Sequence, residues 1–248
     1  SNNNTIGGTT LAAPNVISGN ISHCIVIRAT SANNIVQGNY IGTDVTGASA
    51  LGNAGNGVIL LTGATNNTIG GTGAGATNII AFNAGDGVSL FASALNGNAI
   101  LTNNIYANTD LGIDLAGGTE DGFGVTDNDA NDSDTGPNAL MNFPVITVAG
   151  ESGGTINVNY DLDLIAGDYR IEFFKNPSGA DPSGNGEGEV YASFDTITHT
   201  GSGVESFVHT FAGAAGDIIT ATTTCTATCP DLLSTSEFSD TFTVVVGT

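Results

Sequence analysis

The chain has 248 residues, of which only three are basic and 24 are acidic, so its formal net charge is −21. This balance excludes a nucleic-acid-binding groove, because such a groove needs clustered Lys and Arg to displace counterions, and it disfavours docking on anionic lipid. Hydrophobic residues make up 40% of the chain and charged residues 11%, which predicts a folded protein rather than a disordered one. No apolar run approaches the roughly 20 residues of a membrane span, so we expect no membrane insertion.

The first part of the chain contains an internal repeat. The stretch NNTIGGT begins at Asn3 and again at Asn66, 63 residues later, and NVISGN from Asn15 returns at the same interval as NIIAFN from Asn78. Short segments rich in Ile and Val recur at about a third of that interval, roughly every 21 residues. They are too short for helices and fit strands between sharp Asn-Gly turns. The pattern predicts a parallel β-helix over residues 1–115, with apolar side chains stacked inside and Asn ladders at the turns.

The predicted β-helix has an almost uncharged surface. Residues 1–109 contain only Arg28, Asp44 and Asp86 as charged groups, and such a polar neutral surface suits contact with neutral glycans or with another copy of the chain. No signal-peptide pattern opens the sequence, which looks mature or excised, and Ser1 stands in mid-repeat. An uncapped coil exposes strand edges that another chain can continue. We therefore expect self-association, with a head-to-tail filament as one form.

An acidic segment, residues 116–143, follows the repeat and is predicted to cap it as an ordered linker. The run DNDAND places two aspartates and an asparagine at alternate positions, as a calcium loop does at its start. The glycine and the distal glutamate of an EF-hand are missing. The predicted Ca²⁺ ligands are Asp121, Asp127, Asp129, Asn131, Asp132 and Asp134. The alternative is a solvated acidic linker that binds no ion.

Residues 144–248 show strands with a period of two. In INVNYDLD the side chains of Ile156, Val158 and Tyr160 alternate with polar ones, and YRIEFFK and four later segments alternate in the same way. Gly-rich turns separate these segments. The pattern predicts a seven-strand antiparallel β-sandwich of immunoglobulin type. The chain as a whole is thus expected to be all-β.

Cysteine and histidine add little chemistry. Cys225 and Cys229 lie four residues apart in CTATCP with no histidine nearby, so we prefer a local disulfide to a metal site, and with it an oxidising compartment. Cys24 lies in an apolar run and is predicted to be a small buried hydrophobe. His209 shares a face with two phenylalanines and is predicted to be a core residue rather than a ligand. A minor candidate for cation contact is the loop NPSGADPSGNGEGE, through Asp181, Glu187 and Glu189.

Several longer segments carry a family resemblance: NNIVQGNYIGTDVTGASALGNAGNGVIL, GIDL, DTGPNALMNFPV, YRIEFFKNPSGADPSGNGEGE and STSEFS. Together they resemble segments of secreted bacterial surface proteins that carry right-handed parallel β-helix repeats followed by an immunoglobulin-like module. The resemblance spans nearly the whole chain. It implies a right-handed, pectate-lyase-like coil and an extracellular or cell-surface location. It implies no reaction, because most such proteins are large surface proteins without an assigned activity.

Two polysaccharide chemistries known on β-helices find little support. Lyases that resemble pectate lyase use an Arg or Lys base beside calcium, but the single basic residue of the coils, Arg28, lies in an apolar run. Hydrolases that resemble polygalacturonase share only the NTD element, at Asn108 to Asp110, with this chain. Asp110 and Asp114 would form a glycosidase pair if they were about 5 or 9 Å apart. We therefore expect a non-catalytic structural or adhesive surface protein with no catalytic residue, and a carbohydrate-binding or carbohydrate-active protein is the alternative.

Overall fold

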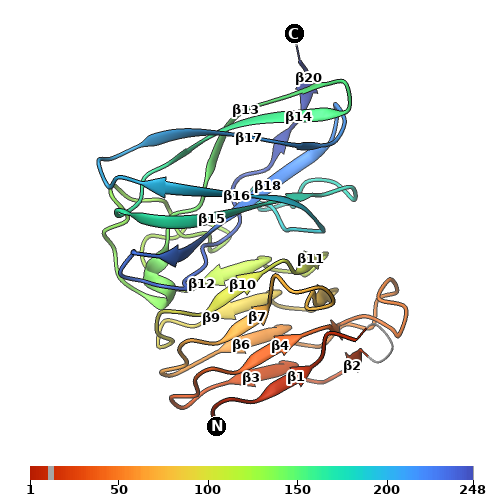
Figure 1. Cartoon of the computed structure of the whole chain (residues 1–248). Helices are drawn as coiled ribbons and strands as arrows, with labels where there is room; N and C mark the ends of the chain where they lie inside the picture. The colour runs from red at the N-terminus through yellow and green to blue at the C-terminus, as the bar shows by residue number, and fades with distance from the viewer. Residues whose placement is uncertain (11–13, 248) are drawn as a thin grey trace.

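The structure, a computed structural model, describes residues 1–10 and 14–247 (Figure 1). Twelve strands up to Leu115 form three parallel sheets, and eight strands from Val145 onward form two further sheets. The one helical element in the described ranges is η1 (Pro137–Leu140), a single 3-10 turn between the two parts. The described chain is all-β, and its first part is a parallel, β-helix-like stack, as predicted.

Each sheet of the stack consists of four strands of three residues. The first sheet contains β1 (Thr5–Gly7), β4 (Ile35–Gln37), β7 (Thr68–Gly70) and β10 (Ala99–Leu101). The second contains β2 (Asn15–Ile17), β5 (Asn39–Ile41), β8 (Ile79–Ala81) and β11 (Asn104–Tyr106). The third contains β3 (Ile25–Ile27), β6 (Val58–Leu60), β9 (Val88–Leu90) and β12 (Ile113–Leu115). One passage of the chain through all three sheets is called a coil below.

The sequence repeat spans two coils. Strand β1 pairs with β4 and β4 pairs with β7, so Asn4, Asn34 and Asn67 occupy one corner at intervals of 30 and 33 residues. Strands follow one another about every ten residues within much of each coil, and the predicted spacing of about 21 is wrong. Neighbouring coils need share only the inward apolar residue and the corner asparagine, whereas alternate coils also share their turn sequences. The repeat of 63 residues is therefore easier to see in the sequence than the interval between neighbouring coils.

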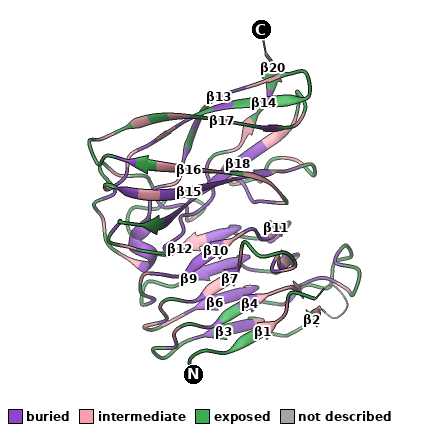
Figure 2. Ribbon diagram, viewed as in Figure 1, coloured by how far each residue is buried: buried purple, intermediate pink, exposed green. Residues whose placement is uncertain are grey.

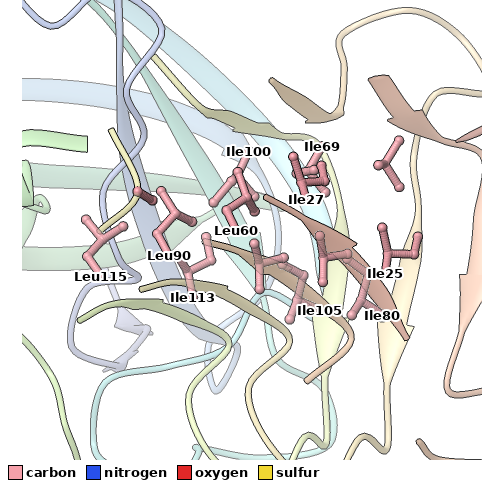
Figure 3. Close-up of a cluster of buried hydrophobic side chains, with 14 of the residues drawn as sticks. Ile25, Ile27, Leu60, Ile69, Ile80, Leu90, Ile100, Ile105, Ile113 and Leu115 are labelled. Carbon is pink, nitrogen blue, oxygen red and sulfur yellow. The ribbon is translucent and has the colours of Figure 1, made fainter. Parts of the chain in front are cut away.

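The interior of the stack is a column of aliphatic side chains. Val36, Ile69 and Ile100 lie in register in the first sheet and are at most 3% exposed. Ile80 and Ile105 stack in the same way in the second sheet. Figure 2 shows this buried interior running through the strands, and Figure 3 shows the side chains following one another along the stack, from Leu115 through Leu90 and Leu60 to Ile27. Burying each such side chain stabilises the fold by roughly 1.5–3 kcal/mol.

Asparagine ladders run along the corners of the stack. The Oδ1 atom of Asn67 accepts the backbone N–H (3.1 Å) and the Nδ2–H (2.8 Å) of Asn34, and the Nδ2 of Asn67 donates to Oδ1 of Asn98 at 2.9 Å. The second ladder contains Asn15, Asn39, Asn78 and Asn103. The third contains Asn20, Asn53, Asn83 and Asn108. These side chains satisfy backbone groups that the turns leave without sheet partners.

Removing one internal asparagine should therefore be costly. Asn67→Ala leaves two donors of Asn34 and the carbonyl of Thr65 without this partner, while the carbonyl of Ser31 keeps only the N–H of Thr65. An unsatisfied buried polar group costs about 1–3 kcal/mol, so we expect the free energy of unfolding in urea to fall by on the order of 3 kcal/mol. Asn4→Ala, at the exposed end of the same ladder, is the matched control and should cost less than about 1 kcal/mol. Equal losses in the two variants would contradict a structural role for the internal ladder.

The second part of the chain is a two-sheet sandwich. Its inner sheet, which faces the β-helix, has the order β16 (Val190–His199), β15 (Gly167–Lys175), β18 (Ile218–Ala227) and β19 (Phe242–Thr243). Its outer sheet has the order β17 (Glu205–Ala212), β14 (Thr155–Leu162), β13 (Val145–Ser152) and β20 (Val245–Val246). Neighbours are antiparallel except β13 and β20. Tyr160, Phe173 and Ile219 belong to the core between the two sheets.

The sandwich has eight described strands where the sequence predicts seven. The segment EFSDTFTVVV was interpreted as one strand, but it crosses from the inner sheet at Phe242 to the outer sheet at Val245. Val244 lies buried at the crossing. An alternating pattern does not reveal the crossing, because side chains on both sides of it still alternate between the core and the surface.

Candidate functional site

The strands of the last coil of the β-helix have an outer edge whose backbone N–H groups need hydrogen-bond acceptors. Strands β10, β11 and β12 are each the terminal strand of their sheet, so no further parallel strand satisfies their outward backbone N–H groups. A buried unpaired N–H costs as much as a lost hydrogen bond. The sandwich lies directly over this end of the stack (Figure 1). The contacts between the two parts are therefore the first place to look for a functional arrangement.

Two glutamates of the sandwich close the edges of the first and third sheets. Glu172, on β15, accepts the N–H of Thr102 through Oε2 at 2.7 Å, directly after β10. Glu237 accepts the N–H of Leu115, the last residue of β12, through Oε1 at 2.7 Å. Its Oε2 accepts the N–H of Thr126 at 2.9 Å. One carboxylate thus joins the sandwich, the last coil and the acidic segment.

A third glutamate closes the second sheet and ends an asparagine ladder. Glu187 accepts the N–H of Ala107 through Oε2, directly after β11. Its Oε1 accepts both the N–H (3.0 Å) and the Nδ2–H (3.1 Å) of Asn108. Inside the ladder, the Oδ1 of the next asparagine accepts this pair of hydrogen bonds. Glu187 therefore takes the place of an asparagine that a further coil would supply, and Glu172, Glu187 and Glu237 are called the glutamate cap below.

The glutamate cap is buried, and burial shifts its titration. Glu172, Glu187 and Glu237 are 0%, 7% and 2% exposed. Burial raises the pKa of the Glu187 carboxyl to about 7 and that of Glu237 to about 8, although both accept backbone hydrogen bonds that oppose the shift. Burial also raises the pKa of Glu172, despite the guanidinium of Arg170 at 2.7 Å. Near neutral pH the carboxyls of Glu187 and Glu237 are therefore close to their titration points.

Apolar and backbone contacts surround the glutamate cap. Phe174 and Phe238 of the sandwich belong to the β-helix core, and their rings meet edge to face with centroids 5.2 Å apart. Ile105, on β11, exchanges two backbone hydrogen bonds with Gly188 of the sandwich, at 2.8 and 2.9 Å. Asn138, from η1, ends the first ladder because its Oδ1 accepts the N–H of Asn98 at 3.0 Å. The two parts of the chain are thus joined by a continuous core.

The predicted calcium ligands lie in two places. Asp121 is exposed and accepts the N–H groups of its own turn. Asp129 and Asp132 lie on either side of Asn142, which accepts the N–H of Asp129 (2.9 Å) and donates its own N–H to Asp132 (2.7 Å). Asp127 is exposed, as is Asn131, which has a left-handed backbone.

These acidic residues do not form a ready-made metal site. Burial raises the pKa of Asp132 to about 7 and that of Asp134 to about 6. Within residues 1–10 and 14–247, no group of three or more His, Cys, Asp and Glu side chains is arranged to hold a metal ion. Calcium binding therefore stays a prediction. In the loop named as a minor cation candidate, Glu187 belongs to the glutamate cap and Glu189 accepts two hydrogen bonds from Ser178.

The candidate glycosidase residues lie on and beside the third sheet. Asp114, in β12, accepts the Oγ–H of Ser89 at 2.8 Å. Burial, followed by the charge of Asp86, raises the pKa of Asp114 to about 7. Asp86 is thus a carboxylate neighbour of Asp114 that the sequence pairing with Asp110 missed. The 25-residue interval between these coils, visible in Asn83 and Asn108, places Asp114 beside Ser89, three residues after Asp86, and could have revealed this neighbour.

The predicted disulfide is present between Cys225 and Cys229, with a Cα–Cα distance of 6.3 Å. Cys24 is half-buried, and burial raises the pKa of its thiol to about 12. Because the disulfide closes a very short loop, we expect Cys225→Ser with Cys229→Ser to lower the free energy of unfolding by only about 2 kcal/mol. Urea unfolding with and without reductant measures the effect. A loss above about 4 kcal/mol would show that the cysteines contribute more than the cross-link.

No protein-family model matches this chain, and no curated protein matches it. No helix in the described part of the chain is long and apolar enough to cross a membrane. The function proposed for this chain therefore rests on its fold and on the contacts between its two parts.

Proposed function

We propose that this chain is a non-catalytic structural or adhesive protein of the cell surface or extracellular space. The observation that carries this proposal is the glutamate cap, which closes all three sheets of the β-helix with side chains of the sandwich. With the shared core of Phe174 and Phe238, it joins both parts into one body. Such a body transmits force along the stack without bending at a linker. The disulfide supports an oxidising compartment.

The test is whether the two parts behave as one mechanical unit. Calorimetry of the whole chain should give a single cooperative transition, and small-angle scattering should fit one rigid particle. Glu187→Ala combined with Glu237→Ala should separate the transition into two steps. Two independent transitions in the unaltered chain would contradict the proposal.

The finer family features are part of the same proposal. We infer a right-handed coil and an immunoglobulin-like sandwich, as in secreted bacterial surface proteins, on the basis of the resembling segments. Self-association is included in a restricted form, because the sandwich covers the last coil and blocks coil-on-coil stacking at that end. A filament of this chain would need another contact surface there. Light scattering at high concentration, with and without Ca²⁺, tests this, and strictly monomeric behaviour would contradict it.

The alternative is a carbohydrate-binding or carbohydrate-active protein that acts on neutral glycans. Its specific support is the pair Asp86 and Asp114, since burial and mutual repulsion give Asp114 a pKa of about 7, which suits a general acid. A glycan array and a reducing-sugar assay test it. Product release that disappears in Asp114→Asn but persists in Asp161→Asn, a sandwich control, would replace the structural proposal by this one.

Calcium remains part of the proposal for the acidic segment. Titration calorimetry of the chain with CaCl₂ should show binding that Asp129→Asn with Asp132→Asn abolishes. Unchanged heats in that variant would assign any bound calcium to another part of the chain.

A further inference from the structure

A Ser–His–Asp cluster lies at one open edge of the sandwich. Strand β16 is the edge of the inner sheet and β17 is the edge of the outer sheet, and each pairs with one neighbour only. Ser193 and Asp195 stand two residues apart on β16 and so project to the same face. His209 projects from β17 into the seam between the two sheets. From its sequence neighbours His209 is predicted to be a core residue, and nothing in the strand pattern connects it with Ser193 or Asp195.

The three side chains are ordered as nucleophile, base and orienting acid. The Oγ of Ser193 lies 2.9 Å from Nε2 of His209. On the other side of the ring, Nδ1 lies 3.9 Å from Oδ1 of Asp195, which is an ion-pair distance. The imidazole stacks on Phe173 with centroids 5.2 Å apart and planes 9° from parallel. Stacking on Phe173 therefore restricts rotation of the imidazole.

The carboxylate is itself held in place. Asp195 accepts the O–H of Tyr160 at Oδ2 (2.8 Å) and the N–H of Thr196 at Oδ1 (2.8 Å). A negative charge beside Nδ1 favours the tautomer that carries its proton there. That leaves the lone pair of Nε2 directed at the hydroxyl of Ser193. This is the arrangement in which an imidazole removes a serine proton and the acid stabilises the resulting imidazolium.

We propose that Ser193 is a nucleophile that His209 activates, and that it accepts the acyl group of small neutral esters. The Oγ–H proton passes to Nε2 as Oγ bonds to the carbonyl carbon. The proton then passes from Nε2 to the leaving alkoxide as the carbon–oxygen bond of the ester breaks. Water, deprotonated by His209 in the same way, releases the acid and restores Ser193. No oxidant, metal or further co-reactant is needed.

The surroundings decide the class of substrate. The side chains of His209 and Asp195 are 19% and 22% exposed, so a small molecule can reach the cluster from the open edge. Because β16 pairs only with β15, N–H groups on its free side can donate to a developing oxyanion. The charge of −21 disfavours anionic esters. This proposal concerns the sandwich edge alone and leaves the mechanical role of the β-helix unchanged; an adduct at Ser193 would replace only the non-catalytic part of the proposed function.

The test uses the whole chain and a fluorophosphonate, in which Oγ–phosphorus bond formation expels fluoride. We expect one adduct per chain at Ser193, by intact mass and peptide mapping. His209→Gln should slow labelling by on the order of 100-fold, and Ser193→Ala should abolish it. The matched control is Ser206→Ala, because the Oγ–H of Ser206 donates its hydrogen bond to a carboxylate, that of Asp161, and not to a histidine. It should label like the unaltered chain.

Further measurements distinguish activation of the Ser193 hydroxyl from a purely structural hydrogen bond between the two sheets. Asp195→Asn, a positioning variant, should slow labelling about tenfold and change its pH profile. Release of 4-nitrophenolate from 4-nitrophenyl acetate should follow the same order of variants. Circular dichroism and thermal unfolding check that each variant folds. No adduct at Ser193, or equal labelling in folded His209→Gln, would overturn the proposal. The Ser193–His209 hydrogen bond would then serve only to hold the two sheets together.

Discussion

Glu237→Ala should lower the free energy of unfolding by on the order of 4 kcal/mol, the largest effect of any single change considered for this chain. Its carboxylate is 2% exposed and accepts the N–H groups of Leu115 and Thr126. Alanine leaves both donors buried without an acceptor, at about 1–3 kcal/mol each. Urea unfolding at pH 5 to 6, where the carboxyl is protonated, measures this loss without the cost of a buried charge.

Two comparisons make this result specific. Glu237→Gln keeps the shape and one acceptor oxygen, so it should lose roughly half as much. Glu151→Ala removes a half-buried glutamate that also accepts a backbone N–H, from Gly154 at 2.7 Å, in an exposed turn, and should cost less than about 1 kcal/mol. Hydrogen exchange should accelerate at Leu115 and Thr126 in Glu237→Ala alone. A stability loss without faster exchange there would contradict capping as the cause.

The second large effect is a loss of stability as the pH rises. Glu187 and Glu237 have pKa values of about 7 and 8 in the folded chain, against an ordinary value of 4.5. Between these values the folded chain binds more protons than the unfolded chain, so stability falls with rising pH across that window. At about 1.4 kcal/mol per pKa unit, we expect a loss on the order of 5 kcal/mol between pH 5 and pH 9.

At acid pH the stability changes in the opposite direction, and it decreases as the pH falls. Hydrogen bonds from Thr200 lower the pKa of Glu205, and Lys175 lowers that of Asp217, so their contribution is lost as the pH falls through those lowered values. Stability should therefore be greatest near pH 4 to 5. Thermal unfolding from pH 2 to 9 measures the curve. Glu187→Gln with Glu237→Gln should flatten its alkaline limb, and an unchanged limb would assign the effect to other carboxyls such as Asp132.

Local patterns were sufficient for the β-helix. A corner asparagine followed by an inward aliphatic residue describes a turn and a three-residue strand, and both features lie within a few positions of each other. Each coil must match the next in register, so the pattern recurs, as in Asn4, Asn34 and Asn67. The disulfide was equally local, because its cysteines are four positions apart in the sequence. The number of coils per repeat was missed because neighbouring coils share only those few residues.

Only the tertiary structure decided how the β-helix ends. Glu172 lies in a strand whose alternation makes it a surface residue, and Glu237 lies in a Ser- and Thr-rich segment without any charged neighbour on its amino-terminal side. Their partners are 70 and 122 residues away. Ser193 and His209 are only 16 residues apart, and their contact was hidden because their strands belong to different sheets.

The physical reason is the range of the interactions. The sequence by itself determined the all-β class, the parallel stack, the Asn ladders and the disulfide, because backbone geometry and side-chain periodicity act over a few residues. The folded chain decided which carboxylates are buried, since a glutamate is placed in an interior only where folding brings unpaired N–H groups to meet it. The residues next to Glu187 and Glu237 in the sequence do not indicate which backbone N–H groups these side chains meet in the folded chain.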